Sequence, residues 1–389
     1  MMATKILKDY MKCALKTLKG RIATEYYRTK KCNKDLWLVS ERGDDARDNG
    51  YFFFKYLREQ HPEINAAYII DNYSADYEKV KNLGRIVQYG SAEHYALMFT
   101  ASKLISSHIM GFTPCPGFFV GVDKRVKLFK GKKVFLQHGI IKDNIEGLKY
   151  PNTDVDLFIC GARPEFEYVV KNYYYPAGVV CYTGLARYDN LFDFDTKKQI
   201  LLMPTWRKWI NAYSIEEFKK NEYFRIYQSF LMNPKMNELL EINGYKLVFY
   251  PHYEIQKFLS MFTGGKNVII ASFSDFDVST LLKESEVLIT DYSSVYFDFA
   301  YMEKPVLYYQ FDREKFFSEH YQKGYFDEST FGPVLIQEQQ VVDALSQILC
   351  GKFKNEGYLK NIREFFEFHD CNNCDRIYNL ISDAIQENI

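Results

Sequence analysis

Hydroxyl and carboxylate side chains follow directly after an apolar segment in the second half of this chain. Residues 287–290 form a short β-branched run, followed at once by Asp291, Ser293 and Ser294. The run predicts a buried strand, and the periodicity from 295 predicts a helix. Ligands bind at the carboxyl ends of parallel strands, and helix N-termini attract phosphate. We therefore expect Ser293 and Ser294 to hold a phosphate group, with simple N-capping by Asp291 or Ser293 as the alternative.

Three of the seven histidines and one arginine also stand directly after an expected strand. His108, His138 and His252 each follow an expected strand, and Arg207 follows another. An imidazole can serve as a general base near neutral pH, and the planar fork of arginine suits phosphate. Gly139 lets a ligand approach His138 closely. Polar side chains gathered at the carboxyl ends of strands indicate that they line one cleft. The alternatives are a turn histidine, favoured for His108, and a surface ion pair for Arg207.

Other chemical motifs are weak. Cys371 and Cys374 form a lone CxxC close to His369, without the second ligand pair that a zinc site needs, and coincidence is the better explanation. Neither a phosphate-binding GxxxxGK[ST] loop nor a GxSxG elbow occurs, so the sequence supports neither a P-loop NTPase nor a hydrolase of that kind. No acidic pair after a strand requires a metal.

Composition narrows the class of protein. The 389 residues include fifty basic and fifty acidic side chains, a balance that argues against a nucleic-acid partner. No run of about twenty apolar residues is long enough to span a bilayer, and the N-terminus lacks the apolar region of a signal peptide. Eight scattered cysteines suit a reducing cytoplasm.

Residues 1–34 differ from the rest of the chain. Ten Lys or Arg stand against two acids, and apolar residues recur at helical spacing beside the lysines. This pattern predicts a helix at an anionic membrane surface, where each basic residue contributes about 1 kcal/mol. The alternative is a helix packed on its own protein with a solvated basic face. The apolar stripe comprises Leu7, Met11, Leu15, Leu18 and Ile22.

Strand and helix patterns alternate in two further blocks, 35–190 and 191–350, which predict two parallel sheets with crossover helices. The length fits two domains. We expect an α/β fold with two Rossmann-like domains facing a central cleft, and helices in 351–389 that bridge them. The expected strands are 36–39, 67–70, 103–106, 133–137 and 156–160, then 199–203, 245–249, 267–270, 287–290 and 306–309. The apolar positions of the bridging helices are Ile362, Phe365, Phe366, Ile377, Leu380, Ile381 and Ile385.

Several of these segments together resemble one family, the CDP-glycerol glycerophosphotransferases, which include the teichoic acid primases and polymerases of Gram-positive bacteria. The resemblance runs from about Leu36 to Asp312, and the chain looks like the compact members, which include primases. The segments that carry it are SERGDDARDNG at 40–50, QHG at 137–139 with Lys142, MPTWR at 203–207, YPH at 250–252, and ITDYSS at 289–294 with Asp298. The family has no counterpart of the CxxC.

The resemblance implies a two-domain GT-B fold and a defined reaction. An acceptor hydroxyl attacks the β-phosphorus of CDP-glycerol, or of a related CDP-alditol, and CMP leaves. It makes His138 the general base and gives a catalytic role to His252, which holds the diphosphate with Arg207, Ser293 and Ser294. Asp291 orients those hydroxyls or binds the glycerol. The complete set of expected substrate-binding residues is Gly139, Thr205, Arg207, Asp291, Ser293, Ser294 and Asp298.

The implied partners are a CDP-alditol donor, a lipid-linked glycan or polymer acceptor and the anionic cytoplasmic face of the cell membrane, with no nucleic acid. No cofactor is required; Mg²⁺ bound to the diphosphate stays an open alternative, although no ligand motif supports it. A GT-B glycosyltransferase that uses a nucleotide sugar is the first alternative, and a non-catalytic membrane scaffold is the second. The sequence does not separate glycerol from ribitol, or a primase from a polymerase.

Overall fold

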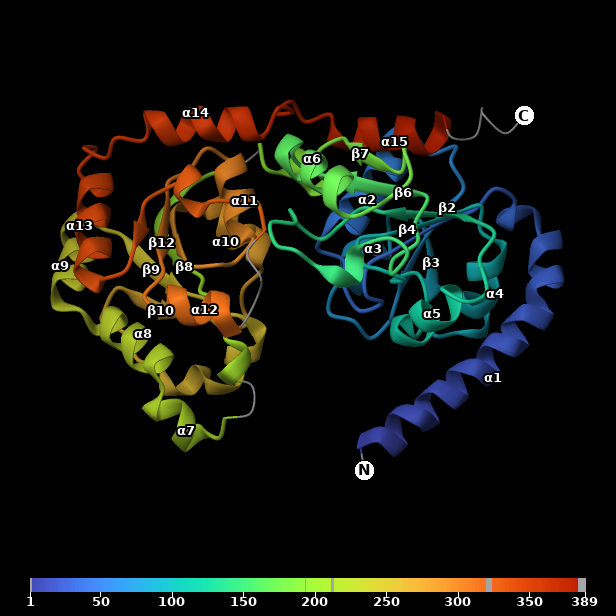
Figure 1. The fold of residues 1–389 in the computed structure, drawn as a ribbon, viewed down its shortest axis with the longest axis horizontal. Helices are drawn as coiled ribbons and strands as arrows, with labels where there is room; N and C mark the ends of the chain where they lie inside the picture. Colours follow the sequence, from blue (N-terminus) through green and yellow to red (C-terminus); the bar gives the residue numbers. More distant parts are fainter. Residues whose placement is uncertain (1, 193, 211–212, 320–323, 384–389) are drawn as a thin grey trace. The chain divides into compact units, whose positions relative to one another are not determined.

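The computed structural model describes residues 2–192, 194–210, 213–319 and 324–383 (Figure 1). It divides into two compact units, each described below by itself. Unit 1 comprises Met1–Ile140, Ile145–Asn190 and Asp370–Ile389, and unit 2 comprises Ile141–Asn144 and Leu191–His369. Ile385, expected in the last helix, lies outside the described residues.

Unit 1 is built on a seven-stranded parallel sheet with the strand order β3-β2-β1-β4-β5-β6-β7. The inner strands are short and almost entirely buried, as expected for a sheet covered on both faces, although β4 and β5 each begin with a lysine. The sequence analysis did not predict the edge strands β3 and β7. The bounds are β1 Trp37–Ser40, β2 Ala66–Ile70, β3 Arg85–Gln88, β4 Lys103–Ser106, β5 Lys132–Phe135, β6 Leu157–Cys160 and β7 Val180–Tyr182.

Helices cover both faces of this sheet. One core lies between the sheet and α2 and α15, and the other between the sheet and α1, α4 and α5. The helices of unit 1 are α1 Met2–Thr29, η1 Lys31–Asn33, α2 Asn49–Gln60, α3 Tyr77–Val80, α4 Ala92–Thr100, α5 Pro116–Asp123, η2 Glu146–Leu148, α6 Arg163–Asn172, η3 Ala186–Asn190 and α15 Asn373–Asp383.

Unit 2 contains a six-stranded parallel sheet with the order β10-β9-β8-β11-β12-β13. The strands are β8 Lys197–Leu202, β9 Lys246–Phe249, β10 Val268–Ile270, β11 Ser285–Thr290, β12 Val306–Tyr309 and β13 Val334–Leu335. The helices are η4 Lys208–Ile210, α7 Ile215–Lys220, α8 Glu222–Met232, α9 Pro234–Asn243, η5 Tyr253–Met261, α10 Val278–Glu284, α11 Val295–Tyr301, α12 Arg313–Glu319, η6 Glu328–Thr330, α13 Glu338–Leu349 and α14 Glu356–Phe365. The predicted α/β alternation is therefore present in both units.

The C-terminal helices belong to different units. Helices α13 and α14 pack in unit 2, and the chain then returns to unit 1, where Ile377 and Ile381 of α15 enter the core beneath α2. The carboxylate of Asp189, in η3, accepts hydrogen bonds from the backbone N–H groups of Asn373 (2.9 Å) and Cys374 (2.8 Å). These bonds satisfy free N–H groups at the start of α15 and fix the point where the chain re-enters unit 1.

Helix α1 packs on α4 through one face only (Figure 1). Cys13 and Thr24 are buried, and a Cβ at Gly20 would lie 2.6 Å from the Cβ of Tyr95, so the close approach requires glycine. The described members of the predicted apolar stripe remain exposed, namely Met11, Leu15, Leu18 and Ile22. Among the described residues, no helix is both long enough and apolar enough to cross a bilayer.

Candidate active site

The carboxyl ends of three adjacent strands of unit 1, β1, β4 and β5, bring Arg42, His108 and His138 together. The rings of His108 and His138 stack with their centroids 4.8 Å apart and their planes at 10°. The Arg42 guanidinium donates from Nε to His108 Nε2 at 3.0 Å, and His108 Nδ1 lies 3.0 Å from the hydroxyl of Ser107. His138 itself reaches solvent. This edge therefore presents one accessible imidazole supported by a second one.

A buried carboxylate fixes the loop between β1 and α2. Glu41 accepts hydrogen bonds from the backbone N–H groups of Arg47 (3.0 Å), Asp48 (2.9 Å) and Tyr51 (2.8 Å). A Cβ at Gly50 would lie 2.6 Å from the carbonyl oxygen of Ser40, so only glycine allows the helix to start this close to the strand. The polar segment 40–50 is thus folded tightly onto the end of β1.

Asn49, in the first turn of α2, positions the backbone that precedes His138. Its Nδ2 donates to the carbonyl oxygens of Gln137 at 2.7 Å and of Leu136 at 3.3 Å. Its Oδ1 accepts from the backbone N–H of Arg187 at 3.0 Å, and the Arg187 guanidinium pairs with Asp48 at 2.7 Å. One buried amide therefore connects β5, α2 and η3. Sequence reasoning did not identify Asn49, Asp48 or Arg187, although all follow from the polar stretch at 44–50 and its partners.

The electrostatic surroundings keep both imidazoles neutral at physiological pH. Desolvation by the surrounding protein lowers the pKa of His138, and the Asp48 carboxylate opposes that effect, while Arg187 and Arg42 add to it. Desolvation also lowers the pKa of His108 to about 2, with smaller contributions from His138 and Arg42. A neutral imidazole has a free lone pair, so His138 is in the protonation state that a general base requires.

In unit 2 the carboxyl ends of β9, β8 and β11 carry the other predicted residues. His252 starts η5, and its Nδ1 accepts from the backbone N–H of Glu254 at 3.3 Å. Its ring lies 6.0 Å from that of Trp206, in the loop after β8. In the same loop, the backbone N–H of Thr205 donates to Asp291 Oδ1 at 2.8 Å. This hydrogen bond therefore connects the loop after β8 to the loop after β11, and the Trp206–His252 contact places the loop after β9 beside them.

Arg207 and Asp291 form a buried ion pair in this unit. Both are 0% exposed, and their closest N–O distance is 2.9 Å. The same guanidinium binds Asp312 at 2.7 and 3.0 Å and the carbonyl oxygen of Thr205 at 2.6 Å. The hydroxyl of Tyr227 donates to Asp291 at 3.2 Å. Neither charge is presented to solvent, so the placement favours a supporting role for this pair over the direct substrate contact expected from the sequence.

The hydroxyls of this edge are better placed to meet a ligand. Ser294 is exposed and does not cap α11. Ser293 is half-buried, and among the described residues its hydroxyl has only a long contact of 3.5 Å from the N–H of Val295. The Oγ1 of Thr205 is buried and has no hydrogen-bond partner among the described residues. Asp298 is buried within α11, and Gly139 is half-buried beside His138.

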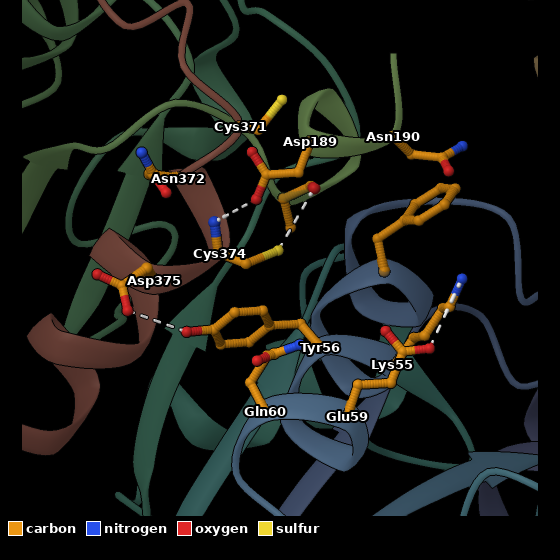
Figure 2. A pocket seen from close by; sticks show the side chains of 12 residues that line it. Lys55, Tyr56, Glu59, Gln60, Asp189, Asn190, Cys371, Asn372, Cys374 and Asp375 are labelled. Atoms are coloured by element: carbon orange, nitrogen blue, oxygen red, sulfur yellow. Dashed lines mark hydrogen bonds and ion pairs between the residues drawn. The ribbon is translucent and has the colours of Figure 1, made fainter. Parts of the chain in front are cut away.

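The CxxC segment lies in a different part of unit 1, at a cavity of about 430 Å³ between α2, η3 and the start of α15 (Figure 2). Cys374 is buried, and its thiol donates to the carbonyl oxygen of Ala186 at 3.4 Å. Burial raises the pKa of both Cys371 and Cys374. Such thiols are poor nucleophiles. Within the described part of the chain, no three His, Cys, Asp or Glu residues are grouped closely enough to hold a metal.

Comparison with known proteins connects these features to one family. A profile described as CDP-glycerol:poly(glycerophosphate) glycerophosphotransferase matches residues 22–383. The minor teichoic acid biosynthesis protein GgaB of Bacillus subtilis (strain 168) is 36% identical over 364 residues, 90% of this chain and 40% of that protein. The teichoic acid poly(glycerol phosphate) polymerase of Bacillus spizizenii (strain ATCC 23059 / NRRL B-14472 / W23) is 33% identical over 174 residues, 44% of this chain and 40% of that protein. The chain thus spans about 40% of the length of these relatives.

Solved structures agree on the fold. The wall teichoic acid polymerase TagF matches with a TM-score of 0.66 at 18% identity, over 98% of this chain and 99% of that one. A putative UDP-N-acetylglucosamine 2-epimerase from Listeria monocytogenes matches with a TM-score of 0.56 at 12% identity, over 91% and 97%. These likenesses confirm the predicted GT-B-like α/β fold class. Because the family profile extends over nearly all of its length, the chain belongs to the CDP-glycerol:poly(glycerophosphate) glycerophosphotransferase family.

Proposed function

We propose that this chain transfers glycerol phosphate, or a related alditol phosphate, from its CDP derivative to a hydroxyl of a membrane-linked acceptor in teichoic acid or related cell-surface polymer synthesis. The observation that carries the proposal is the solvent-accessible, neutral imidazole of His138 at the end of β5, held in place by Asn49, in a member of this family. One solved structure of the polymerase TagF was obtained from crystals soaked with CDPG, which supports the choice of donor.

In the proposed reaction, His138 accepts the proton of the acceptor hydroxyl as its oxygen attacks the β-phosphorus of the donor. The new bond joins the acceptor oxygen to phosphorus. The bond from the β-phosphorus to the oxygen that bridges the two phosphates breaks, and its electron pair leaves with CMP. Positioned general-base catalysis of this kind contributes about 10²–10⁴-fold to the rate. The nearby Asp48 carboxylate favours the imidazolium that forms during attack.

Donor binding is assigned to unit 2. His252, Ser293 and Ser294 would donate hydrogen bonds to the diphosphate, where charge develops as CMP leaves. The buried Arg207–Asp291 pair would hold the loops after β8 and β11 in register without touching the donor. This division of roles revises the expectation that the guanidinium itself grips phosphate.

A release assay tests the proposal. The enzyme is incubated with CDP-glycerol, CDP-ribitol or UDP-glucose and a lipid-linked acceptor, and the nucleotide products are separated. We expect CMP from a CDP-alditol and no UDP from UDP-glucose. Release of UDP with transfer of the sugar would instead establish the glycosyltransferase alternative. His61→Gln, at the far end of α2, serves as the histidine control for His138→Ala.

We further propose that α1 holds the enzyme at the cytoplasmic face of the cell membrane as a peripheral protein. The support is the exposed stripe of Met11, Leu15, Leu18 and Ile22 on a helix whose opposite face is already packed on α4. Ten basic residues in 1–34 would add attraction to anionic lipid. A lipid-linked acceptor would then lie at the same surface as the enzyme.

A further inference from the structure

A second cavity, of about 900 Å³, opens at the amino-terminal edge of the unit 1 sheet, the edge opposite to His138. Its floor is a row of three side chains from the first residues of adjacent strands. Trp37 of β1 is paired in register with Lys103 of β4, and Lys103 with Lys132 of β5. Cross-strand partners point to the same face of a sheet, so two lysines project beneath α15 in a row that otherwise belongs to the apolar core.

Lys103 is an unusual lysine. It is 5% exposed, and its ammonium has no hydrogen bond or ion pair with any described residue. Burial and, to a lesser extent, the neighbouring Lys132 lower the pKa of Lys103, and the Asp156 carboxylate opposes them. Lys133, the next residue after Lys132, points to the other face of the sheet and shows the ordinary solution, a 2.8 Å ion pair with Asp123. The Asp156 carboxylate attracts the Lys103 ammonium but forms no ion pair with it, so the ammonium is left to face the cavity, where it can pair with an anion.

A second unsatisfied group lines the same cavity. The hydroxyl oxygen of Ser382, on α15, is buried and has no hydrogen-bond partner among the described residues. Lys31 and Lys34 of the chain just after α1 stand at the rim. The lining also includes the carboxylates of Asp35 and Glu63, so four lysines face two acids. The donors without partners among the described residues, Lys103 and Ser382, both line this cavity.

We propose that this cavity binds a phosphodiester group of an anionic alditol-phosphate chain, the polymer acceptor itself. The inference rests on the proposed function, since that reaction extends such a chain. An ammonium and a hydroxyl without partners suit the oxygens of one phosphate. Because Lys103 is only 5% exposed, the headgroups of a flat membrane cannot contact it. A flexible polymer can place a single phosphate group inside the cavity. The volume falls within the range of ordinary ligand sites.

The position of the cavity predicts a dependence on acceptor length. Lys132 opens β5 and His138 follows its end, so the strand alone, at about 3.3 Å per residue, separates the two sheet edges by about 10 Å. An acceptor of one repeat cannot occupy the cavity and reach His138 together, but a chain of several repeats can. The cavity would therefore increase the affinity for long acceptors without affecting the chemistry on short ones, as expected for a second linked binding site.

The test measures binding of a soluble oligo(glycerol phosphate) of about eight repeats to the full chain by titration calorimetry. Lys103→Met should weaken binding by at least about tenfold, the loss expected for one charge-assisted contact. Lys127→Met, whose side chain is 84% exposed on the same unit, is the matched control and should bind normally. Lys103→Arg, which keeps the charge, should retain most of the affinity. The melting temperature of ligand-free Lys103→Met should equal or exceed that of the wild type, because the change removes an unpaired buried charge.

Three results would overturn the inference. They are equal binding of the oligomer by the wild type and Lys103→Met, equally tight binding of inorganic phosphate alone, and a Lys103-dependent affinity for phosphatidylglycerol vesicles in place of the oligomer. Kinetics then separate this inference from the proposed function. Lys103→Met should raise KM for the octamer at least about tenfold and leave CMP release with a one-repeat acceptor unchanged. Absence of CMP release with every acceptor would instead refute the proposed function, even if the oligomer still bound through Lys103.

Discussion

The imidazole of His138 stacks on that of His108, with ring centroids 4.8 Å apart and planes at 10°. The two rings come from neighbouring strands, so their separation is set by the strand spacing of the sheet. Two imidazolium ions at this distance would repel each other, and His138 indeed contributes to the lowered pKa of His108. The stack therefore holds the His138 ring in a fixed orientation against a neutral neighbour.

Replacing His138 tests its role as the base. His138→Ala should lower turnover by about 10²–10⁴-fold while the far-ultraviolet circular dichroism spectrum and the melting temperature stay close to those of the wild type, since the ring is exposed. CMP release from CDP-glycerol measures the effect. Near-normal turnover would remove His138 as base. His108→Phe keeps a flat ring in the stack and should be the milder of the two changes.

The pH profile reports the protonation state of His138. Its pKa is lowered from the ordinary histidine value of about 6.5, so the neutral, active form persists below that pH, and the acid limb of kcat/KM should lie on the acid side of pH 6.5. Arg42 contributes to the lowering. Arg42→Gln should therefore raise the pKa and move the limb to higher pH. Arg42→Lys retains the charge and should leave the limb in place; equal shifts for both variants would contradict this account.

Asn49 should act through the backbone it holds. Asn49→Leu removes the two hydrogen bonds to the carbonyls before His138 and leaves those oxygens unsatisfied, at a cost of about 1–3 kcal/mol each. The melting temperature should fall and kcat should drop, with KM for CDP-glycerol little changed, because the donor groups are assigned to unit 2. A raised KM with normal kcat would indicate a substrate contact instead. Asn152→Ala, which removes a half-buried amide of the same unit that bonds the carbonyl oxygen of Glu146, is the control.

Much of this fold is predictable because buried parallel strands leave a clear trace in sequence. The expected strands at 103–106 and 306–309 coincide with β4 and β12. The edge strands β3 and β7 were missed, because β3 is only half-buried and carries Arg85 and Gln88, and β7 is three residues long. A short or polar segment of this kind has the sequence pattern of a loop, and only its hydrogen bonds to the neighbouring strand make it a strand.

The site was predictable only in part. Placement after a strand predicted that His138, His252 and the two serines lie at the carboxyl ends of strands, which is where the structure has them; their roles stay predictions. The same placement could not reveal that the Arg207 side chain is buried. The carboxylate that forms the most hydrogen bonds with it, that of Asp312, is 105 residues further along the chain. Asn49 was hidden for the same reason, because its partners at 136–137 are distant in sequence.

Arg207 should prove more important for stability than for donor affinity. Arg207→Met leaves two buried carboxylates without their cation, and breaking a buried pair in this way costs about 3–5 kcal/mol. Scanning calorimetry should show a lower unfolding temperature for the variant. Arg207→Lys should also destabilise, because an ammonium cannot reproduce the two-pronged contact with Asp312. A stable Arg207→Met protein whose only defect is a raised KM would restore the direct phosphate contact expected from the sequence.

The exposed stripe of α1 should account for membrane binding. A variant with Gln at Met11, Leu15, Leu18 and Ile22 keeps every basic residue and the packed face, so folding should be preserved while the apolar contribution to binding is lost. Sedimentation with phosphatidylglycerol vesicles should show at least about a tenfold loss of affinity. Ile242→Gln, which removes a side chain as exposed as Ile22 (both 74%), is the control and should bind normally. Undiminished vesicle binding by the α1 variant would leave electrostatic attraction as the whole interaction, and raising the salt concentration would then abolish it.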